Sequence, residues 1–325
     1  KTCLVSYDDI ISIENLLEAW REFRRGKKQK KDAQEFEQHL MTHVLNLHQD
    51  LQEKTYVHSA YHAFNIADPK PRDIHKASVC DRLLHHAIYR ILYPYFDARF
   101  IHDSYSCRNG KGTHRALERF KSFGYKVSKN NTKTCFVLKC DIRKFFASID
   151  QRILLDILTQ ALEEKDILWL LARVIWSFNS GKPNTGLPLG NLASQLLVNI
   201  YMNEFDQYVK HILKVKQYIR YADDFVIFSQ DKKYLETILE QMKEFLETKL
   251  HLCMHPDKVF IKTLASGVDF LGWVHFPHHF VLRTATKRKM FRKVSEKNIA
   301  SYKGMLGWGN GWKVLKKVEK RVFYD

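Results

Sequence analysis

Two adjacent acids inside an apolar pattern constrain this chain most. Asp223 and Asp224 lie between two runs rich in aromatic and β-branched residues, Tyr218–Tyr221 and Phe225–Phe228. Such runs are typical of strands, so the sequence predicts two strands joined by a tight turn that carries both carboxylates. Adjacent carboxylates repel each other, and a divalent cation offsets that repulsion because hard cations take oxygen ligands. A solvated turn is the alternative, since Asp is common in turns.

A third acid precedes this pair by about eighty residues. Residues 136–140 read as a short buried strand that ends on Asp141. After Asp150 the apolar residues recur at spacings of three and four, which predicts a helix. Acids in such places are often only helix caps, and this alternative applies to Asp141 and Asp150 alike. With the Asp223–Asp224 turn on a neighbouring strand, Asp141 supplies the third oxygen ligand that a two-metal site needs.

Together these segments resemble the palm of a reverse transcriptase, in which a strand ends on an acid five residues before Phe146 and a Tyr-Ala-Asp-Asp hairpin follows. Four further blocks match that family in the correct order, from a fingers-like stretch to a segment that resembles the primer grip: residues 64–74, 186–195, 255–258 and 270–273. The resemblance covers roughly residues 55 to 280.

The resemblance implies an α+β fold, a right-hand polymerase with fingers, a palm that holds an antiparallel sheet, and a small helical thumb. It divides the chain into a basic helical extension, a fingers and palm domain, and a basic helical thumb: residues 1–55, 56–280 and 281–325. The implied activity is RNA-directed DNA polymerase. The implied cofactor is Mg²⁺, as two ions, for which Mn²⁺ can substitute.

The same resemblance assigns roles to individual residues. The expected metal ligands are Asp141, Ile142, Asp223 and Asp224. The three acids among them are also the expected catalytic residues. The residues expected to bind the incoming nucleotide are Lys70, Arg72, Phe146, Leu189, Gly190 and Lys258. The residues expected to bind template or primer are Gln195, Leu271, Gly272, Trp273, Lys316, Lys317, Lys320 and Arg321.

Each nucleotide-binding role has a chemical reason and an alternative. Lys70 and Arg72 would clamp the triphosphate, and the planar guanidinium of Arg suits bidentate phosphate contact. Lys258 would neutralise or protonate the pyrophosphate leaving group. Solvated surface positions are the alternative for these three residues. The ring of Phe146 would exclude a ribose 2′-hydroxyl and so select deoxynucleotides; a core role is its alternative.

Residues 189–204 are similar to the reverse transcriptases of diversity-generating retroelements, and residues 103–116 look like that group and its group II intron relatives. Most reverse transcriptases carry Gln where this chain has Leu189, and an apolar residue there removes hydrogen bonds from the nascent base pair. The subfamily therefore implies error-prone copying at template adenines, which serves targeted mutagenesis. It also implies a structured template RNA, a primer and cDNA, dNTPs, and a small basic accessory protein oligomer as partners.

Other readings stay open. The chain can be another prokaryotic reverse transcriptase, for phage defence or of group II intron descent. Intron relatives usually continue into a maturase domain, for which we expect no room after Asp325. A catalytically dead RNA-binding scaffold belongs to a different class, and the intact acids at 141, 223 and 224 argue against it.

Charge supports a polyanionic partner. The chain holds 53 Lys and Arg against 36 Asp and Glu, a net charge of +17, which favours phosphate contacts. Residues 286–325 hold twelve basic and three acidic residues, interleaved with Phe291, Tyr302, Trp308 and Trp312, which suits base stacking. A second basic run spans residues 24–31, with a solvated face as its alternative.

The remaining patterns concern location and secondary structure. No run of eighteen apolar residues predicts a membrane span, and the first eight residues lack a signal-peptide core. The six cysteines have no metal-ligand spacing, so we expect reduced thiols in the cytoplasm of a prokaryote, encoded by it or by a phage. We expect helices over residues 10–22, 33–51, 80–100, 191–213 and 232–250, a β segment over 268–282, and a mostly helical end.

Overall fold

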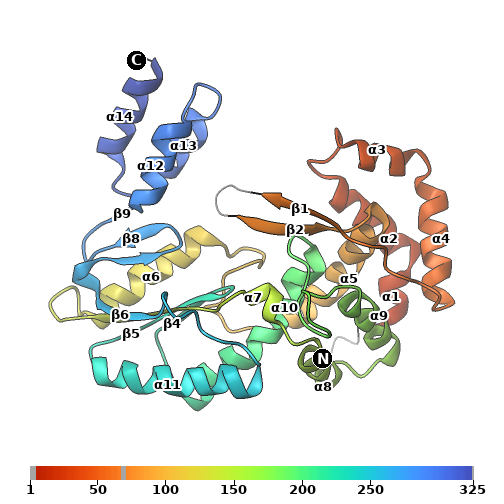
Figure 1. Ribbon diagram of the computed structural model, residues 1–325, viewed down its shortest axis with the longest axis horizontal. Helices are drawn as coiled ribbons and strands as arrows, with labels where there is room; N and C mark the ends of the chain where they lie inside the picture. Colours follow the sequence, from red (N-terminus) through yellow and green to blue (C-terminus); the bar gives the residue numbers. More distant parts are fainter. Residues whose placement is uncertain (1–4, 67–70, 324–325) are drawn as a thin grey trace. The chain divides into compact units, whose positions relative to one another are not determined.

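The computed structural model describes residues 5–66 and 71–323. The chain divides into two compact units, each built from three separate stretches (Figure 1). The first unit comprises Lys1–His102, Ile142–Ile212 and Lys243–Met254. The second unit comprises Asp103–Asp141, Leu213–Met242 and His255–Asp325. Helices are mixed with antiparallel sheets, which confirms the α+β class.

The first unit begins with five helices: α1 (Tyr7–Ile11), α2 (Ile13–Arg24), α3 (Lys31–Gln38), α4 (Leu40–Gln52) and α5 (Val79–Asp97). The predicted helix over 10–22 is broken at Ser12, because its side chain accepts a hydrogen bond from the Asn15 amide and begins a new helix. The predicted helix over 33–51 is likewise divided at His39.

The rest of the first unit holds a hairpin and further helices: β1 (His62–Ile66), β2 (Arg72–Lys76), α7 (Phe145–Ser148), α8 (Gln151–Ala161), α9 (Lys165–Trp176), α10 (Leu192–Gln207) and the π-helical turn Tyr208–Ile212. Asp150 caps α8 by accepting hydrogen bonds from the amides of Arg152 and Ile153, which confirms the capping alternative for this acid. The strands β1 and β2 pair in an antiparallel arrangement.

A four-stranded antiparallel sheet forms the centre of the second unit, in the order β4 (Tyr218–Tyr221), β5 (Asp224–Ser229), β3 (Phe136–Asp141), β6 (Phe260–Thr263). The two edge strands of this sheet, β4 and β6, thus come from separate segments of the sequence. Helix α6 (Thr113–Val127) covers one face, and the first part of α11 (Lys232–Lys249) covers the other (Figure 1).

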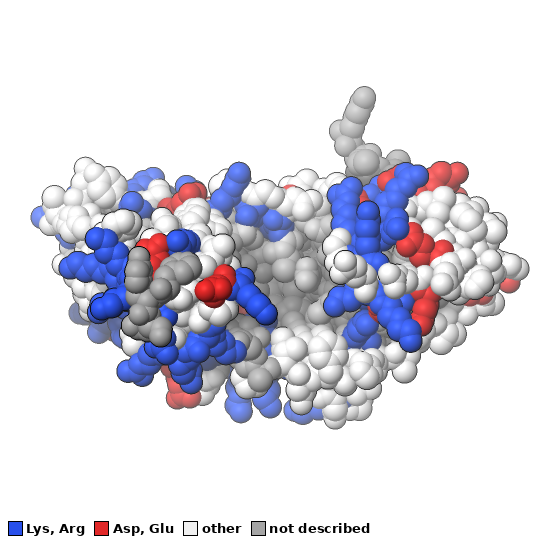
Figure 2. Space-filling model, turned by 90° about the horizontal axis from the view of Figure 1, so that it is seen from above, with Lys and Arg blue, Asp and Glu red and all other residues white. Residues whose placement is uncertain are grey.

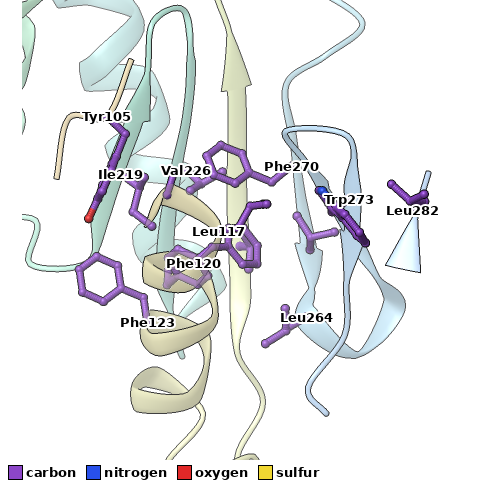
Figure 3. Close-up of a cluster of buried hydrophobic side chains, with 14 of the residues drawn as sticks. Tyr105, Leu117, Phe120, Phe123, Ile219, Val226, Leu264, Phe270, Trp273 and Leu282 are labelled. Atoms are coloured by element: carbon purple, nitrogen blue, oxygen red, sulfur yellow. The ribbon is translucent and has the colours of Figure 1, made fainter. Parts of the chain in front are cut away.

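The C-terminal part of the second unit comprises a three-stranded sheet and three helices: β7 (Val268–Phe270), β8 (Trp273–His275), β9 (Phe280–Leu282), α12 (Thr284–Lys293), α13 (Ile299–Gly307) and α14 (Trp312–Phe323). One apolar core joins these elements to α6 and the four-stranded sheet (Figure 3). Within it the ring of Phe120 lies 4.8 Å from that of Phe228 and 5.3 Å from that of Phe270. Gly124 leaves room for this packing, since a Cβ there would come within 2.9 Å of Leu264.

The aromatic residues of the C-terminal segment divide into two sets. Trp312 is 65% exposed and Trp308 is 37% exposed, so both can stack on bases. Phe291 and Tyr302 instead pack against the apolar core. Base stacking by the two exposed tryptophans stays a prediction, whereas the packing of Phe291 and Tyr302 leaves those two rings less available for it.

The described cysteines, at positions 80, 107, 135, 140 and 253, are thiols rather than disulfides. Cys3 lies outside the described residues. Over the ranges 5–66 and 71–323, no helix combines the length and apolar character needed to cross a membrane.

Gly309 offers a sharp test of the packing between the C-terminal helices and β8. A Cβ at Gly309 would overlap the ring of Trp273, which is only 6% exposed and has little space to move. We expect Gly309→Ala to lower the free energy of unfolding by about 1–3 kcal/mol through overpacking. Gly304→Ala is the matched control, because that helical glycine has no atom near its missing Cβ. Gly304→Ala should raise the free energy of unfolding by about 0.5–1 kcal/mol. Urea unfolding measures both variants. Equal changes in their free energies of unfolding would show that residue 309 is not tightly packed against Trp273.

Candidate active site

Strand pairing brings the three predicted carboxylates to one end of the four-stranded sheet. Asp141 closes β3 and lies opposite Asp224, the first residue of β5, in the antiparallel register. Tyr221 pairs with Asp224 across the β4–β5 hairpin, which leaves Ala222 and Asp223 as its two turn residues. All three acids belong to the second unit.

The turn itself is strained and is held by a buried arginine. Ala222 has a φ of +55°, a left-handed conformation that costs an L-residue on the order of 1–2 kcal/mol. The guanidinium of Arg220, which is 1% exposed, donates to the Ala222 carbonyl oxygen at 3.2 Å. It also donates to the hydroxyl of Ser104 at 3.2 Å. Sequence reasoning missed this role, although one charged residue within an apolar strand pattern was a visible signal.

Two lysines face the carboxylates. Lys258 Nζ lies 2.8 Å from Asp141 Oδ1, and Lys139 Nζ lies 3.1 Å from Asp224 Oδ1. The His255 amide donates to the Asp141 carbonyl oxygen at 2.7 Å, which anchors the segment that carries Lys258. Lys139 was missed by sequence reasoning, although it lies two residues before Asp141 and so points to the same face of β3.

The electrostatics of the turn are unfavourable for Asp223. Burial, followed by the charges of Asp224 and Asp141, raises the pKa of Asp223 to about 6. The loss of water around Asp223 is the larger cause, and the two neighbouring carboxylates add to it.

The donor chemistry fits a hard divalent cation, since three carboxylates supply oxygen ligands. Within residues 5–66 and 71–323, no three His, Cys, Asp or Glu side chains are grouped closely enough to hold a metal ion. Asp141 and Asp224 are directed at lysines instead. The Lys258 side chain is 43% exposed and has space to withdraw, whereas that of Lys139 is 9% exposed. Ile142 follows Asp141, is buried, and forms an isolated bridge with Met254 in the first unit.

The first unit brings together several predicted nucleotide-binding residues. The Leu187 amide donates to the carbonyl oxygen of the half-buried Phe146 at 2.8 Å, and the His75 amide donates to the Leu189 carbonyl oxygen at 3.2 Å. Gly190 has a φ of +104°, and a Cβ there would come within 3.0 Å of Ile74. The loop that contains residues 186–190 is thus joined to α7 on one side and to β2 on the other.

The remaining predicted residues lie as follows. Arg72 begins β2 and is exposed, and Gln195 is half-buried on α10. Lys70 lies outside the described residues. Leu271 and Gly272 form the β7–β8 turn with φ values of +50° and +87°, and Trp273 begins β8.

The four basic residues predicted to bind nucleic acid, which are Lys316, Lys317, Lys320 and Arg321, are all exposed on α14. Figure 2 shows Lys and Arg gathered over the C-terminal helices of the second unit. The ammonium of Lys316 lies 5.0 Å from the ring centre of the exposed Trp312, so one helix presents charge beside an aromatic surface.

The raised pKa of Asp223 predicts a stability that depends on pH in metal-free protein. Below about pH 4 the carboxyl is protonated in both the folded and unfolded chain. Between about pH 4 and 6 the unfolded chain loses the proton first, so folding stability falls as pH rises, and the full cost remains above pH 6. A shift of about two pKa units sets an upper limit of about 3 kcal/mol.

Asp223→Asn should therefore raise the melting temperature in EDTA at pH 8 and leave it unchanged near pH 4. Asp257→Asn, at an exposed position, is the control. Thermal melts at both pH values measure the difference. A lower melting temperature for Asp223→Asn at pH 8 would contradict the view that the ionised Asp223 carboxylate destabilises the folded protein.

Comparison with protein families and curated proteins gives a consistent result. The family model described as reverse transcriptase (RNA-dependent DNA polymerase) matches residues 67–275. Protein YkfC of Escherichia coli is 25% identical over 252 residues, which cover 66% of this chain and 64% of that protein. The group II intron-encoded protein LtrA of Lactococcus lactis is 23% identical over 298 residues, which cover 69% of this chain and 48% of that protein. The chain thus spans about half to two thirds of the length of these relatives.

Solved structures give a likeness of fold. Telomerase from Candida albicans, solved with a fragment of telomeric RNA, aligns with a TM-score of 0.55 at 10% identity, over 72% of this chain and 48% of that one. Apo telomerase from Candida tropicalis aligns with a TM-score of 0.54 at 12% identity, over 76% of this chain and 51% of that one.

Proposed function

The chain belongs to the reverse transcriptase family, and from this premise we propose that it is an RNA-directed DNA polymerase, which copies template RNA into cDNA from a primer and dNTPs. One observation carries the proposal. Asp141 and Asp224 are register partners on adjacent strands, with Asp223 in the turn beside them. Burial together with the charges of Asp224 and Asp141 raises the pKa of Asp223, and a bound cation would relieve the part that comes from those charges.

The roles of this chain's residues follow from their positions. Bound Mg²⁺ ions, or Mn²⁺ in their place, would activate the primer 3′-hydroxyl and hold the triphosphate. Asp141, Asp223 and Asp224 supply ligands, and Ile142 follows the first of them along the backbone. Lys258 lies 2.8 Å from Asp141 Oδ1 on a side chain that is 43% exposed, and it would neutralise or protonate the leaving pyrophosphate.

The other proposed binding roles rest on separate observations for each segment. Arg72 is exposed on β2 and suits a triphosphate clamp together with Lys70. Phe146 lies against the loop that contains Leu189 and Gly190, which suits a pocket for the sugar and the nascent pair. The β7–β8 turn and residues 281–325 act as primer grip and thumb, and residues 56–280 as fingers and palm.

The direct test is primer extension. Purified protein receives an RNA template, an annealed DNA primer, dNTPs and Mg²⁺, with parallel reactions in EDTA and with ribonucleotides. We expect full-length cDNA with Mg²⁺ alone or Mn²⁺ alone, and none in EDTA. Absence of extension under all metal conditions, with RNA binding retained, would favour an RNA-binding scaffold instead.

A finer proposal concerns the type of enzyme. We propose an error-prone polymerase of a diversity-generating retroelement, which works in a prokaryotic cytoplasm with a structured template RNA and a small basic accessory protein oligomer. The support is the apolar Leu189 within the 189–204 block; residues 103–116 resemble both this group and its group II intron relatives. The template RNA and the accessory protein follow from this subfamily and share its test.

Fidelity should depend on Leu189. Leu189→Gln adds a polar side chain beside the nascent pair, and one or two added hydrogen bonds are worth on the order of 1–3 kcal/mol. We expect misincorporation opposite template adenine to fall about tenfold or more. Sequencing of cDNA from a single template measures both forms, and Leu192→Gln on the adjoining helix serves as the control. Identical error spectra would remove Leu189 from the mechanism.

A second candidate is a reverse transcriptase of group II intron descent. It is favoured because the relatives include two intron-encoded or intron-processing proteins by name. One is LtrA, and the other is the nuclear intron maturase 4 of Arabidopsis thaliana. The maturase is 30% identical to this chain over 135 residues, which cover 40% of this chain and 16% of that protein. The DNA that flanks the gene separates the two. A template and variable repeat pair that differs at adenines supports the first candidate, and intron boundaries support the second. A phage-defence role would show neither.

A further inference from the structure

Lys139 is a buried lysine in the four-stranded sheet, and the proposed chemistry does not use it. Its strand, β3, pairs with β5 on one side and with β6 on the other, which holds the backbone of Lys139 opposite Val226 and Phe260. Both of these register partners are apolar, and the Lys139 side chain is only 9% exposed. Lysine is almost never buried to this extent unless an anion pairs with it. The position therefore needs an anionic partner.

That partner is one of the three acids of the candidate site. Opposite residues of an antiparallel pair share a face and side chains alternate along a strand, so Lys139, Asp141 and Asp224 lie on one face of the sheet. Lys139 is the diagonal neighbour of Asp224, a separation that a long side chain spans. Its Nζ lies 3.1 Å from Asp224 Oδ1, and the Asp224 side chain is 25% exposed. One oxygen of Asp224 is thus held by a cation of the protein itself.

The second lysine of the site differs in its freedom to move. Lys258 pairs with Asp141 through a side chain that is 43% exposed, and it lies between strands rather than within one. Lys139 lies in a strand that is hydrogen-bonded on both edges, and its side chain is buried. The positive charge of Lys139 is therefore a fixed part of the site.

We propose that Lys139 is a positioning residue, which holds the Asp224 carboxylate in place for catalysis and weakens the attraction of the acids for a divalent cation. The proposal rests on the proposed function as a metal-dependent polymerase. Its two parts act in opposite directions. The ion pair orients a carboxylate, which favours the reaction, whereas like charges repel, so the ammonium opposes a cation bound beside Asp224. Loss of Lys139 should accordingly slow the reaction and tighten cation binding.

Thermal melts in EDTA test the ion pair without metal or catalysis. Lys139→Met keeps the aliphatic stem and removes the ammonium, which leaves Asp224 without its cation. We expect the melting temperature to fall by about 4 °C or more. In an Asp224→Asn background the same change should cost less than about 1 °C, because the carboxylate that Lys139 neutralises is already absent. Equal losses in the two backgrounds would overturn the proposal.

The matched control removes a lysine from the neighbouring strand. Lys262 lies on β6 of the same sheet, and it is exposed. Lys262→Met makes the same chemical change and should shift the melting temperature by less than about 1 °C, since exposed charges contribute little to stability. A loss as large as that of Lys139→Met would assign the effect to net charge rather than to the pair with Asp224, and would overturn the proposal.

Cation binding is measured separately, with nucleic acid and dNTPs omitted. Mn²⁺ is titrated and its free concentration followed by electron paramagnetic resonance. Lys139→Met should bind Mn²⁺ about tenfold more tightly, because a positive charge near the cation is gone. Lys139→Arg, which keeps the charge, and Lys262→Met should both stay near the parent. Damage to the fold would weaken Mn²⁺ binding, so tighter binding has no such explanation. An unchanged or weaker affinity in Lys139→Met would overturn the proposal.

Primer extension tests the positioning role. Lys139→Met should lower kcat about tenfold or more and leave the KM for dNTP nearly unchanged, because a misplaced carboxylate affects the rate rather than nucleotide binding. Lys139→Arg should recover most of the rate. A raised KM with an unchanged kcat would mean that Lys139 contacts the triphosphate, which would overturn the proposal. Absence of extension by the parent protein would refute the proposed function, while the EDTA melts and the Mn²⁺ titration still judge the role of Lys139.

Discussion

Asp223→Asn abolishes cDNA synthesis and leaves RNA binding nearly intact: this is the largest effect that we expect from any single substitution. The carboxylate lies in the turn between β4 and β5, beside the register pair Asp141 and Asp224. Asn keeps the shape and removes the anionic ligand. A two-metal site that loses one ligand charge should lose at least about a thousandfold in rate, because metal stabilisation of charge is the main source of acceleration in phosphoryl transfer.

The control for this experiment uses the same chemical change at another acid. Asp257 lies on the segment that carries Lys258, and it is exposed. Asp257→Asn should retain primer extension within about twofold. Because Asp223→Asn is expected to be more stable than the parent in EDTA, a loss of activity there cannot be ascribed to unfolding. Normal extension by Asp223→Asn would refute the assignment of the active site.

Removal of four charges from α14 should produce the second large effect. Lys316, Lys317, Lys320 and Arg321 are exposed on one helix beside Trp312. Each phosphate contact to a single strand releases counterions and contributes about 0.7 to the slope of log K against log salt. Replacing all four with Gln should flatten that slope by up to about 3 and weaken binding most at low salt.

A matched control removes the same net charge from other exposed positions of the second unit: Lys129, Lys133, Lys232 and Lys233. Titrations of a single-stranded RNA at several salt concentrations compare both quadruple variants with the parent. A general effect of net charge would change the two slopes equally. That outcome, or an unchanged slope for the α14 variant, would show that this helix has no direct phosphate contacts.

Local patterns predicted much of the secondary structure. The apolar run before Asp141 became β3, and the runs on both sides of the Ala222–Asp223 turn became β4 and β5. Helix boundaries were less predictable. The helix expected over residues 33–51 is divided at His39, a residue that apolar periodicity does not mark as a break.

Long-range contacts around the candidate site were not predictable in the same way. Lys258 and Asp141 are 117 residues apart, and their ion pair exists because the His255 amide joins the carbonyl oxygen of Asp141. Lys139 was not singled out, since a lysine in a strand pattern usually faces solvent; here the strand is central in its sheet and the side chain is buried.

The sequence by itself determined the family, the order of its motifs and the excess of positive charge, and it predicted the three acids, because each of these depends on neighbouring residues or on composition alone. Only the tertiary structure decided that Asp141 lies opposite Asp224 and that Arg220 holds the Ala222 turn. The physical reason is that strand register and burial are set by packing between distant segments. Those packing contacts also determine which polar groups lose contact with water, and this loss raises the pKa of Asp223.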